Sequence, residues 1–432
     1  MHDSYANRRQ LALDAIHPGV LIVPSSPTVL RNGDVAYEYR QDSDFYYLTG
    51  FEEPGSVLVL MSPAEHRFTL FLRPRDPERE VWDGPRAGLE GAMRDLGAEQ
   101  ARPHEELVAR LPDLLRNRSR LFYRFGRDRA LDDAILNAIA GLRTQARKGV
   151  WWPRELIDPE TVLHELRVTK TPAELELVRR AVAITNEAVL LAMAEARPGR
   201  YEYEIEALVR GTFHRLGAER VAFAPTVASG PNATVLHYRR NDRALGPGDL
   251  LLLDIGCEYR YYASDVTRTL PVSGTFSGPQ ARIYQLVLRA QEAALARVNP
   301  GATLEQVHQA ALSTITEGLV ELGLVMGPVA EALEERRYQP FFMHRTSHYL
   351  GMDVHDVGLY HYEGTPRPLE PGMLVTVEPG VYVADRADVP PEYRGIGVRI
   401  EDDVLVTEEG HEVLSAGIPK ALADVERLCR RS

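Results

Sequence analysis

Residues 344–356 read HRTSHYLGMDVHD, a segment that places three histidines within twelve residues. Acidic residues that could complete a metal site lie on both sides of it, at Asp254, Asp265, Glu378 and Glu401. One imidazole among four carboxylates makes a site rich in hard oxygen ligands. Such a site suits Mn²⁺, Co²⁺ or a similar divalent ion better than the sulfur-rich shell of a structural zinc does. The segment therefore predicts a metal-dependent hydrolase.

Two of these acids are close in sequence. Asp254 ends the apolar run 250–253, and Asp265 follows eleven residues later. This spacing predicts two neighbouring strands joined by a short hairpin, which would bring both carboxylates to one point. An aspartate in an apolar strand is costly unless a positive charge neutralises it, and a metal ion is the simplest source of that charge. Either aspartate alone could equally well form an ion pair or cap a turn.

The two glutamates are expected at strand ends. Either one alone would most simply be a solvated surface acid. Four acids together with His348 instead favour two divalent ions about 3.5–4 Å apart, held by bridging carboxylates, with a shared water that loses a proton near neutral pH. We expect all five ligands in strands or at strand ends, because a precise metal site needs a rigid backbone.

Size and charge narrow the class of protein. The 432 residues exceed what one core usually supports, which predicts two domains. A formal charge of −12 argues against a nucleic-acid-binding surface. The N-terminal residues do not resemble a secretory signal, and no apolar run is long enough to span a membrane. The two cysteines lie far apart in sequence, so we expect the protein to be located in a reducing cytoplasm.

We expect a boundary between two domains near residue 170. Upstream, strand-like runs such as 20–23, 56–60 and 68–72 alternate with helical stretches, which indicates an α/β unit. The segment Thr171-Pro172-Ala173-Glu174 has the residues of a capping box with proline at the first helical position. We therefore predict domains at 1–170 and 171–432.

The second domain is expected to open with helices. A long helix should follow the capping box and end before residues 197–200, and a second should cover about 203–216. After a strand-rich stretch ending at Leu270, two more helices are predicted at 280–298 and 303–322. Beyond His344 we expect short strands and turns.

The five candidate ligands also carry a resemblance. In their order along the chain they resemble the signature of the pita-bread metallopeptidases, which include methionine aminopeptidase, prolidase and aminopeptidase P. The block 344–358, with residues 236–238 upstream and 393–402 downstream, is most similar to bacterial aminopeptidase P. Segments 42–51 (DSDFYYLTGF) and 80–84 (EVWDG) resemble that family's N-terminal domain, so the resemblance covers nearly the whole chain.

The resemblance implies a fold of mixed α/β (α+β) class. An N-terminal creatinase-like α/β domain would help assembly and substrate access. The C-terminal pita-bread domain would be two-layered and pseudo-symmetric, with its sheet cupping the metals.

The resemblance also implies a division of labour among the ligands. Asp265 and Glu401 would bridge two metals, Asp254 would complete one site, and His348 and Glu378 would complete the other. The water shared by the metals would attack the scissile carbonyl, and Glu378 would move its proton to the leaving nitrogen.

Further residues match family positions around the ligands. His237 and His355 would hydrogen-bond the substrate and the tetrahedral intermediate. Arg399 matches an arginine near the bridging glutamate, Tyr382 an active-site position that binds substrate, and Trp82 a residue close to substrate. On sequence alone, His237 would more simply be a packed core residue. His344 is placed near the site without a ligand role, and His361 is left unassigned.

The implied reaction removes the N-terminal residue of a peptide whose second residue is proline. Ordinary peptidases handle that bond badly, because it is a tertiary amide without an N–H and with a fixed φ. Flat rings such as His355 and Tyr382 could recognise the proline. The expected cofactors are two divalent ions, Mn²⁺ first, with Co²⁺, Zn²⁺ or Fe²⁺ as alternatives. The expected partners are peptide substrates and copies of this chain in a dimer or tetramer.

Three alternatives stay open at this point. Prolidase would use the same ligands but accept dipeptides only. Metal-free hydrolysis of the creatinase type is disfavoured, since all five ligand positions hold competent residues. A catalytically silent relative acting as a binding protein would usually have lost one or more of these ligands.

Overall fold

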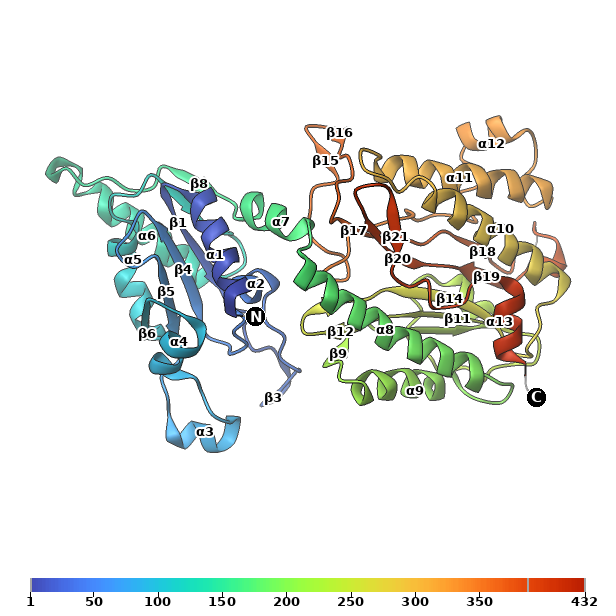
Figure 1. Cartoon of the computed structure of the whole chain (residues 1–432), viewed down its shortest axis with the longest axis horizontal. Helices are drawn as coiled ribbons and strands as arrows, with labels where there is room; N and C mark the ends of the chain where they lie inside the picture. Colours follow the sequence, from blue (N-terminus) through green and yellow to red (C-terminus); the bar gives the residue numbers. More distant parts are fainter. Residues whose placement is uncertain (1, 387, 431–432) are drawn as a thin grey trace. The chain divides into compact units, whose positions relative to one another are not determined.

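The computed structural model describes residues 2–386 and 388–430, and the chain divides into two compact units, Met1–Leu166 and Arg167–Ser432 (Figure 1). The ranges 1–170 and 171–432 predicted from the sequence remain a proposal. The capping box that suggested them is present: Thr171 accepts a hydrogen bond from the backbone of Glu174, whose side chain accepts one in return. The mixed α/β class and the two-part organisation predicted from the sequence are confirmed.

The N-terminal unit is built on one mixed sheet, with strand order β6-β5-β4-β1-β7-β8. Helices α5 and α6 pack on one face, where leucines and isoleucines four residues apart meet Val20 and Ile22 of β1. Helix α1 contacts β1 and β4 from the other side (Figure 1). The strands predicted at 20–23, 56–60 and 68–72 are confirmed as β1, β4 and β5. The elements are α1 (His2–Ile16), β1 (Gly19–Pro24), β2 (Leu30–Asn32), β3 (Val35–Ala36), α2 (Ser43–Thr49), β4 (Val57–Ser62), β5 (Phe68–Leu72), α3 (Pro77–Asp83), α4 (Gly88–Leu96), β6 (Gln100–Pro103), α5 (Leu107–Leu115), β7 (Arg120–Phe122), α6 (Arg129–Arg143) and β8 (Glu155–Ile157); α7 (Glu160–Val168) crosses into the second unit.

The C-terminal unit contains the four helices predicted from the sequence, two before and two after its first group of strands, and all four are confirmed within a few residues. They are α8 (Pro172–Glu195), α9 (Glu202–Arg215), α10 (Gly278–Leu295) and α11 (Leu304–Glu321). The remaining elements are β9 (Arg220–Val221), β10 (Thr226–Ser229), β11 (Leu250–Ile255), β12 (Cys257–Tyr259), β13 (Tyr262–Ala263), β14 (Val266–Pro271), α12 (Val329–Glu334), β15 (His361–Tyr362), β16 (Thr365–Pro366), β17 (Leu374–Val377), β18 (Gly380–Val383), β19 (Ile396–Arg399), β20 (Asp402–Val406), β21 (His411–Val413) and α13 (Leu422–Cys429).

The C-terminal unit repeats one arrangement. The packed pair α8 and α9 is followed by the antiparallel sheet β10-β11-β14, and the packed pair α10 and α11 is followed by the antiparallel sheet β17-β20-β21. Figure 1 shows the strands between the two helix pairs. The repeats meet where the backbone N–H of Glu401 donates to the carbonyl of Thr267, 3.1 Å away. This junction brings residues from both repeats to one place.

Two local predictions need correction. Asp254 and Asp265 do lie at adjacent antiparallel strands, with Asp254 opposite Thr267, but their connection is not a simple short hairpin. It carries β12 and β13, which pair with each other, and it needs Gly256, where a Cβ would lie 1.8 Å from the carbonyl oxygen of Ser264. His348 lies in an irregular segment rather than in a strand; only the next residue, Tyr349, makes an isolated bridge, to Val375.

Among the residues that the structure describes, every helix is too short or too polar to cross a bilayer.

Candidate metal centre

A cavity of about 690 Å³ opens in the C-terminal unit. All five ligands predicted from the sequence line it, and so do three of the predicted outer residues: Asp254, Asp265, His348, Glu378 and Glu401, with His237, His355 and Arg399. The ligands reach it from β11, from the start of β14, and from the segments beside β17 and β20. The fold thus gathers side chains that are up to 147 residues apart in sequence (401 − 254).

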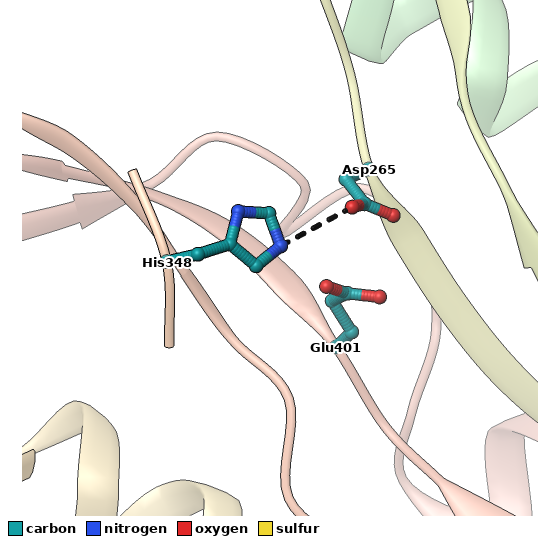
Figure 2. Close-up of side chains that lie close together, drawn as sticks. All are labelled: Asp265, His348 and Glu401. Atoms are coloured by element: carbon teal, nitrogen blue, oxygen red, sulfur yellow. Dashed lines mark ion pairs between the residues drawn. The ribbon is translucent and has the colours of Figure 1, made fainter. Parts of the chain in front are cut away.

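The centre of the cluster is formed by Asp265, His348 and Glu401. Each offers one ligand atom, and these atoms all lie within 4.8 Å of one another (Figure 2). The Nε2 atom of His348 is 3.5 Å from Asp265 Oδ2 and 3.6 Å from Glu378 Oε1. The spacing leaves room for a cation among the four side chains.

The imidazole of His348 is held in the tautomer that a metal requires. Its Nδ1 lies 2.9 Å from the backbone carbonyl oxygen of Tyr349, which can only accept a hydrogen bond, so Nδ1 carries the proton. The lone pair is then on Nε2, the atom that faces the carboxylates. Metal-binding histidines are commonly fixed in this way by a backbone carbonyl.

Thr267 and Arg399 hold the acids in place. The hydroxyl of Thr267 donates to Glu401 Oε2 at 2.6 Å and accepts from Arg399 Nε at 3.1 Å. The same guanidinium donates to Asp254 Oδ2 at 2.6 Å. One buried arginine therefore links the carboxylate of β11 to the one that precedes β20.

Burial makes the charged form of these acids costly. It raises the pKa of Asp265 and of Glu378 well above the ordinary value, with repulsion from Glu401 as the next cause. For Glu401, burial and then Asp254 raise the pKa to about 7, against the attraction of His348 and Arg399. Without a further cation the cluster resists full ionisation.

The donor set fits divalent metal ions. Oδ1 of Asp254 and Oδ1 of Asp265 are buried and have no hydrogen-bond partner in the described part of the chain. A buried carboxylate oxygen without a donor is expensive. A hard cation would satisfy both oxygens and would also relieve the repulsion among the acids.

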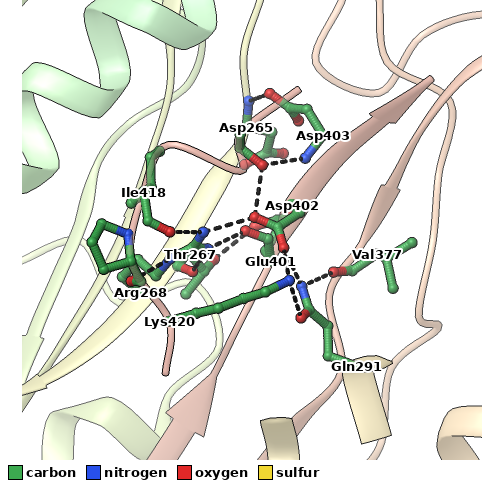
Figure 3. A network of polar contacts seen from close by, with 12 residues as sticks. Asp265, Thr267, Arg268, Gln291, Val377, Glu401, Asp402, Asp403, Ile418 and Lys420 are labelled. Carbon is green, nitrogen blue, oxygen red and sulfur yellow. Dashed lines mark hydrogen bonds and ion pairs between the residues drawn. The ribbon is translucent and has the colours of Figure 1, made fainter. Parts of the chain in front are cut away.

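A second charged cluster lies directly behind Glu401. Asp402 accepts at one oxygen from Arg268 and Ser415, at 2.7 and 2.6 Å, and at the other from Gln291 and Lys420, at 2.7 and 2.5 Å (Figure 3). Arg268 also donates to the backbone carbonyl of Glu401. The sequence analysis missed this cluster; its one local signal was a run of three acids beside apolar strands.

Asp403, the third acid of that run, touches the site from outside. Its Oδ2 accepts from the backbone N–H of Asp265 at 3.2 Å.

His308 was also missed: it lines the cavity and its Nδ1 contacts the Thr346 hydroxyl at 2.8 Å. Burial, with a smaller effect of Arg345, lowers its pKa to about 4. On the sequence it follows the apolar pattern of α11, so it resembled a core residue.

Four other histidines border the cavity, three of them predicted near the site and one, His361, left unassigned. His237 is exposed there, so the alternative of a packed core residue does not hold. The His355 ring lies 4.5 Å from the His348 ring, centroid to centroid. His344 lines the cavity and contacts the Tyr382 hydroxyl, and burial lowers its pKa to about 3, which keeps it neutral. His361 also lines the cavity, on β15.

Two predicted substrate-binding residues are not among the cavity-lining side chains. Tyr382 is 1% exposed, and its hydroxyl contacts Arg399 Nη1 at 2.8 Å and His344 Nε2 at 2.9 Å. Trp82 lies on α3 of the N-terminal unit, with 85% of its surface exposed. Contact of either residue with substrate stays a prediction.

Fold and site together define a metal-dependent hydrolase. The profile of the Metallopeptidase family M24 matches residues 176–408, and that of the Aminopeptidase P, N-terminal domain, matches residues 5–123. The chain is 41% identical over 427 residues to the Xaa-Pro aminopeptidase of Escherichia coli, covering 98% of this chain and 97% of that one. It is 37% identical to Xaa-Pro aminopeptidase 3 of Homo sapiens, covering 95% and 81%.

Solved structures of similar proteins support the same family assignment. Aminopeptidase PepP of Pseudomonas aeruginosa superposes with a TM-score of 0.96 at 45% identity, over 99% of this chain and 98% of that one. Zn-substituted Escherichia coli aminopeptidase P in complex with product gives a TM-score of 0.96 at 40% identity, over 100% and 99%. The chain therefore belongs to metallopeptidase family M24, in the group of the Xaa-Pro aminopeptidases, as its sequence predicted.

Proposed function

We propose that this chain releases the N-terminal residue from peptides with proline in second position, using two divalent ions. Asp265 and Glu401 would be shared by the two ions, Asp254 would hold one of them, and His348 and Glu378 would hold the other. The observation that carries the proposal is the convergence of ligand atoms of Asp265, His348 and Glu401 within 4.8 Å. Four carboxylates and one imidazole favour Mn²⁺, and Co²⁺, Zn²⁺ and Fe²⁺ suit the same donors.

The bound ions would polarise the scissile carbonyl and lower the pKa of a shared water. Glu378 is the residue that we propose moves the proton. Its carboxylate borders the cavity beside His348, so it can take a proton at the point of attack and deliver it to the leaving nitrogen. Proton delivery matters at this bond, because the proline nitrogen leaves as an amine that must gain a hydrogen.

His237 and His355 are proposed to donate hydrogen bonds to substrate oxygens. Both line the cavity, and donors aimed at a developing oxyanion stabilise it most where water is excluded. Arg399 is proposed to keep the carboxylate of Asp254 correctly oriented through the 2.6 Å contact. Tyr382 and Trp82 are kept as proposed substrate-binding residues.

The proposed setting follows the sequence. We propose a cytoplasmic enzyme that acts on peptides and assembles as a dimer or tetramer, with the N-terminal domain contributing to assembly and access. Manganese is the proposed native metal. The alternative substrate class is the Xaa-Pro dipeptide of a prolidase, which uses the same ligands and differs in whether the space beyond the proline is open.

The test is cleavage of a matched substrate set by protein stripped of metal and then restored with Mn²⁺. The set contains Xaa-Pro, Xaa-Pro-Xaa-Xaa and an Xaa-Ala-Xaa-Xaa control. Release of the first residue from the longer proline peptide, only with metal, is the expected result. Cleavage of the dipeptide alone would make the enzyme a prolidase. Failure to cleave either substrate by folded, metal-loaded protein would contradict the proposed activity and favour a binding protein.

A further inference from the structure

Asp356, the residue after His355, is a buried anion held by two cations. Its Oδ1 accepts from Arg167 Nη2 at 2.7 Å, and its Oδ2 accepts from Lys170 Nζ at 3.0 Å. The three side chains are only 1 to 3% exposed. We infer that these three residues, called here the Asp356 clamp, position His355 in the cavity; the inference rests on the proposed function.

The cations of the clamp stand on a fixed part of the C-terminal unit. Lys170 donates its backbone N–H to the carbonyl of Gly372 at 2.8 Å, and Thr169 forms a β-bridge with Met373. The capping box of α8 begins at the next residue, Thr171. The segment 169–171 is therefore attached to the region of strand β17 on one side and to helix α8 on the other.

The loop that carries His355 is wrapped around the clamp. The backbone N–H of Asp356 donates to the carbonyl of Tyr349 at 2.9 Å, which closes the loop beside His348. A Cβ at Gly351 would lie 2.1 Å from Asp356 Oδ2 and 2.8 Å from Lys170 Cε. Only glycine fits there, so the loop has been packed directly onto the ion cluster.

Among the described residues, the ring of His355 makes one ring contact, with His348. No hydrogen bond from the described part of the chain holds its ring, which is exposed to the cavity and rests edge to face on the ring of His348. Its place is therefore set by its backbone, and that backbone is fixed by Asp356. A buried ion cluster is weak evidence for stability, because desolvation offsets much of the attraction. Geometric control of His355 is the use that these contacts support.

The test is a double-mutant cycle of wild type, Lys170→Met, His355→Ala and the double variant, with Mn²⁺ and an Xaa-Pro-Xaa-Xaa peptide at saturation. If the clamp acts through His355, Lys170→Met lowers kcat about tenfold, as supporting residues around metal sites commonly do. In the His355→Ala background the same change alters kcat less than about twofold. Lys170→Arg keeps the charge and restores most of kcat.

Metal affinity separates this role from a general one. Titration calorimetry should give a Kd for Mn²⁺ within about threefold of wild type for Lys170→Met, because supporting shells that act on a ligand itself change affinity by tenfold or more. The matched control is Arg179→Met, which breaks the half-exposed pair with Glu412 and should change neither quantity. An equal loss of kcat in both backgrounds, or a loss of metal affinity that matches it, would overturn the inference.

Two further measurements keep the test decisive. If Lys170→Met fails to fold by circular dichroism, Asp356→Asn removes the charge at nearly constant volume and takes its place in the cycle. If wild type cleaves no Xaa-Pro peptide, the proposed function fails, but the clamp is still tested by the NMR resonances of the His355 ring. These should broaden in Lys170→Met and not in Arg179→Met; unchanged resonances would contradict the clamp.

Discussion

Glu401 and Asp402 are neighbours in the chain, both are buried, and their electrostatic surroundings are opposite. Glu401 faces the cavity and other acids, and burial with repulsion from Asp254 raises its pKa to about 7. Burial alone would also raise the pKa of Asp402, but Arg268 and Lys420 lower it below its ordinary value. Across one peptide bond, the protein supplies cations for the carboxylate of Asp402 and leaves the carboxylate of Glu401 in need of one.

The difference shows which cluster is complete without a ligand. Every oxygen of Asp402 has hydrogen-bond donors, and two of them are cationic (Figure 3). In the cavity, Asp254 and Asp265 each keep a buried oxygen without a donor among the residues that the structure describes. The cations therefore balance the acid of the structural cluster, whereas Arg399 does not balance the four acids of the functional one.

The largest expected effect is loss of activity on breaking the cavity cluster. Asp265→Ala removes a proposed bridging ligand, so kcat/KM for an Xaa-Pro-Xaa-Xaa peptide should fall at least about a thousandfold, since metals supply several kcal/mol to the transition state. Circular dichroism should remain that of wild type. Asp424→Ala, which removes a half-exposed acid on α13, is the control and should keep full activity. Retained activity in Asp265→Ala would remove the basis of the comparison.

The second effect concerns stability in the other cluster. Asp402→Ala leaves the buried Arg268 and the partly buried Lys420 without their anion. Urea unfolding of the metal-free protein should show a loss of about 3–5 kcal/mol. Glu401→Ala, measured in the same way, should cost far less, because it relieves repulsion. Equal losses in the two variants would mean that the clusters do not differ as described.

The pH dependence follows from the raised pKa of Glu401. Its ordinary value is 4.5 and its folded value is about 7, so the folded state binds this proton more tightly than the unfolded state. The resulting stabilisation of metal-free wild type is fully present below pH 4.5 and is lost as the pH rises through 7. Glu401→Gln has no titratable group at this position, so it does not lose stability in this way. In chelator, its stability relative to wild type should therefore increase from pH 5 to pH 8, by on the order of 3 kcal/mol. A difference that stays constant with pH would be the contrary result.

The smallest expected effect tests the support of Glu401. Thr267→Val removes the hydroxyl that donates to Glu401 and accepts from Arg399. The affinity for Mn²⁺ by calorimetry should fall about tenfold, the size of one hydrogen bond to a charged group. Thr316→Val is the matched control: its buried hydroxyl donates within α11, to the carbonyl of Leu312. An equal change in both variants would show a packing effect instead.

The sequence predicted what local pattern encodes. The capping box at Thr171 and the apolar periodicity of α8 to α11 gave those helices, because helix signals lie within a few residues. The run 250–253 ending in Asp254 likewise predicted β11. The resemblance named five ligands, which the fold brings to one cavity; their roles remain predictions.

What the sequence could not show depends on distant pairing. Arg268 meets Asp402 across 134 residues, and Lys170 meets Asp356 across 186, so neither ion pair leaves a local pattern. The irregular conformation at His348 was missed because its backbone is set by neighbours such as Thr376, whose N–H donates to the His348 carbonyl. Helix α13 was not predicted either.

The most direct test of the account is the number of Mn²⁺ ions that metal-free protein binds. Titration calorimetry at pH 7.5 should give two ions per wild-type chain. Asp265→Ala should lose at least one of them, and Lys420→Met, which alters the balanced cluster, should still bind two. Binding of one ion or none by folded wild type, or two by Asp265→Ala with unchanged affinity, would contradict the claim that the cavity acids form a dinuclear site.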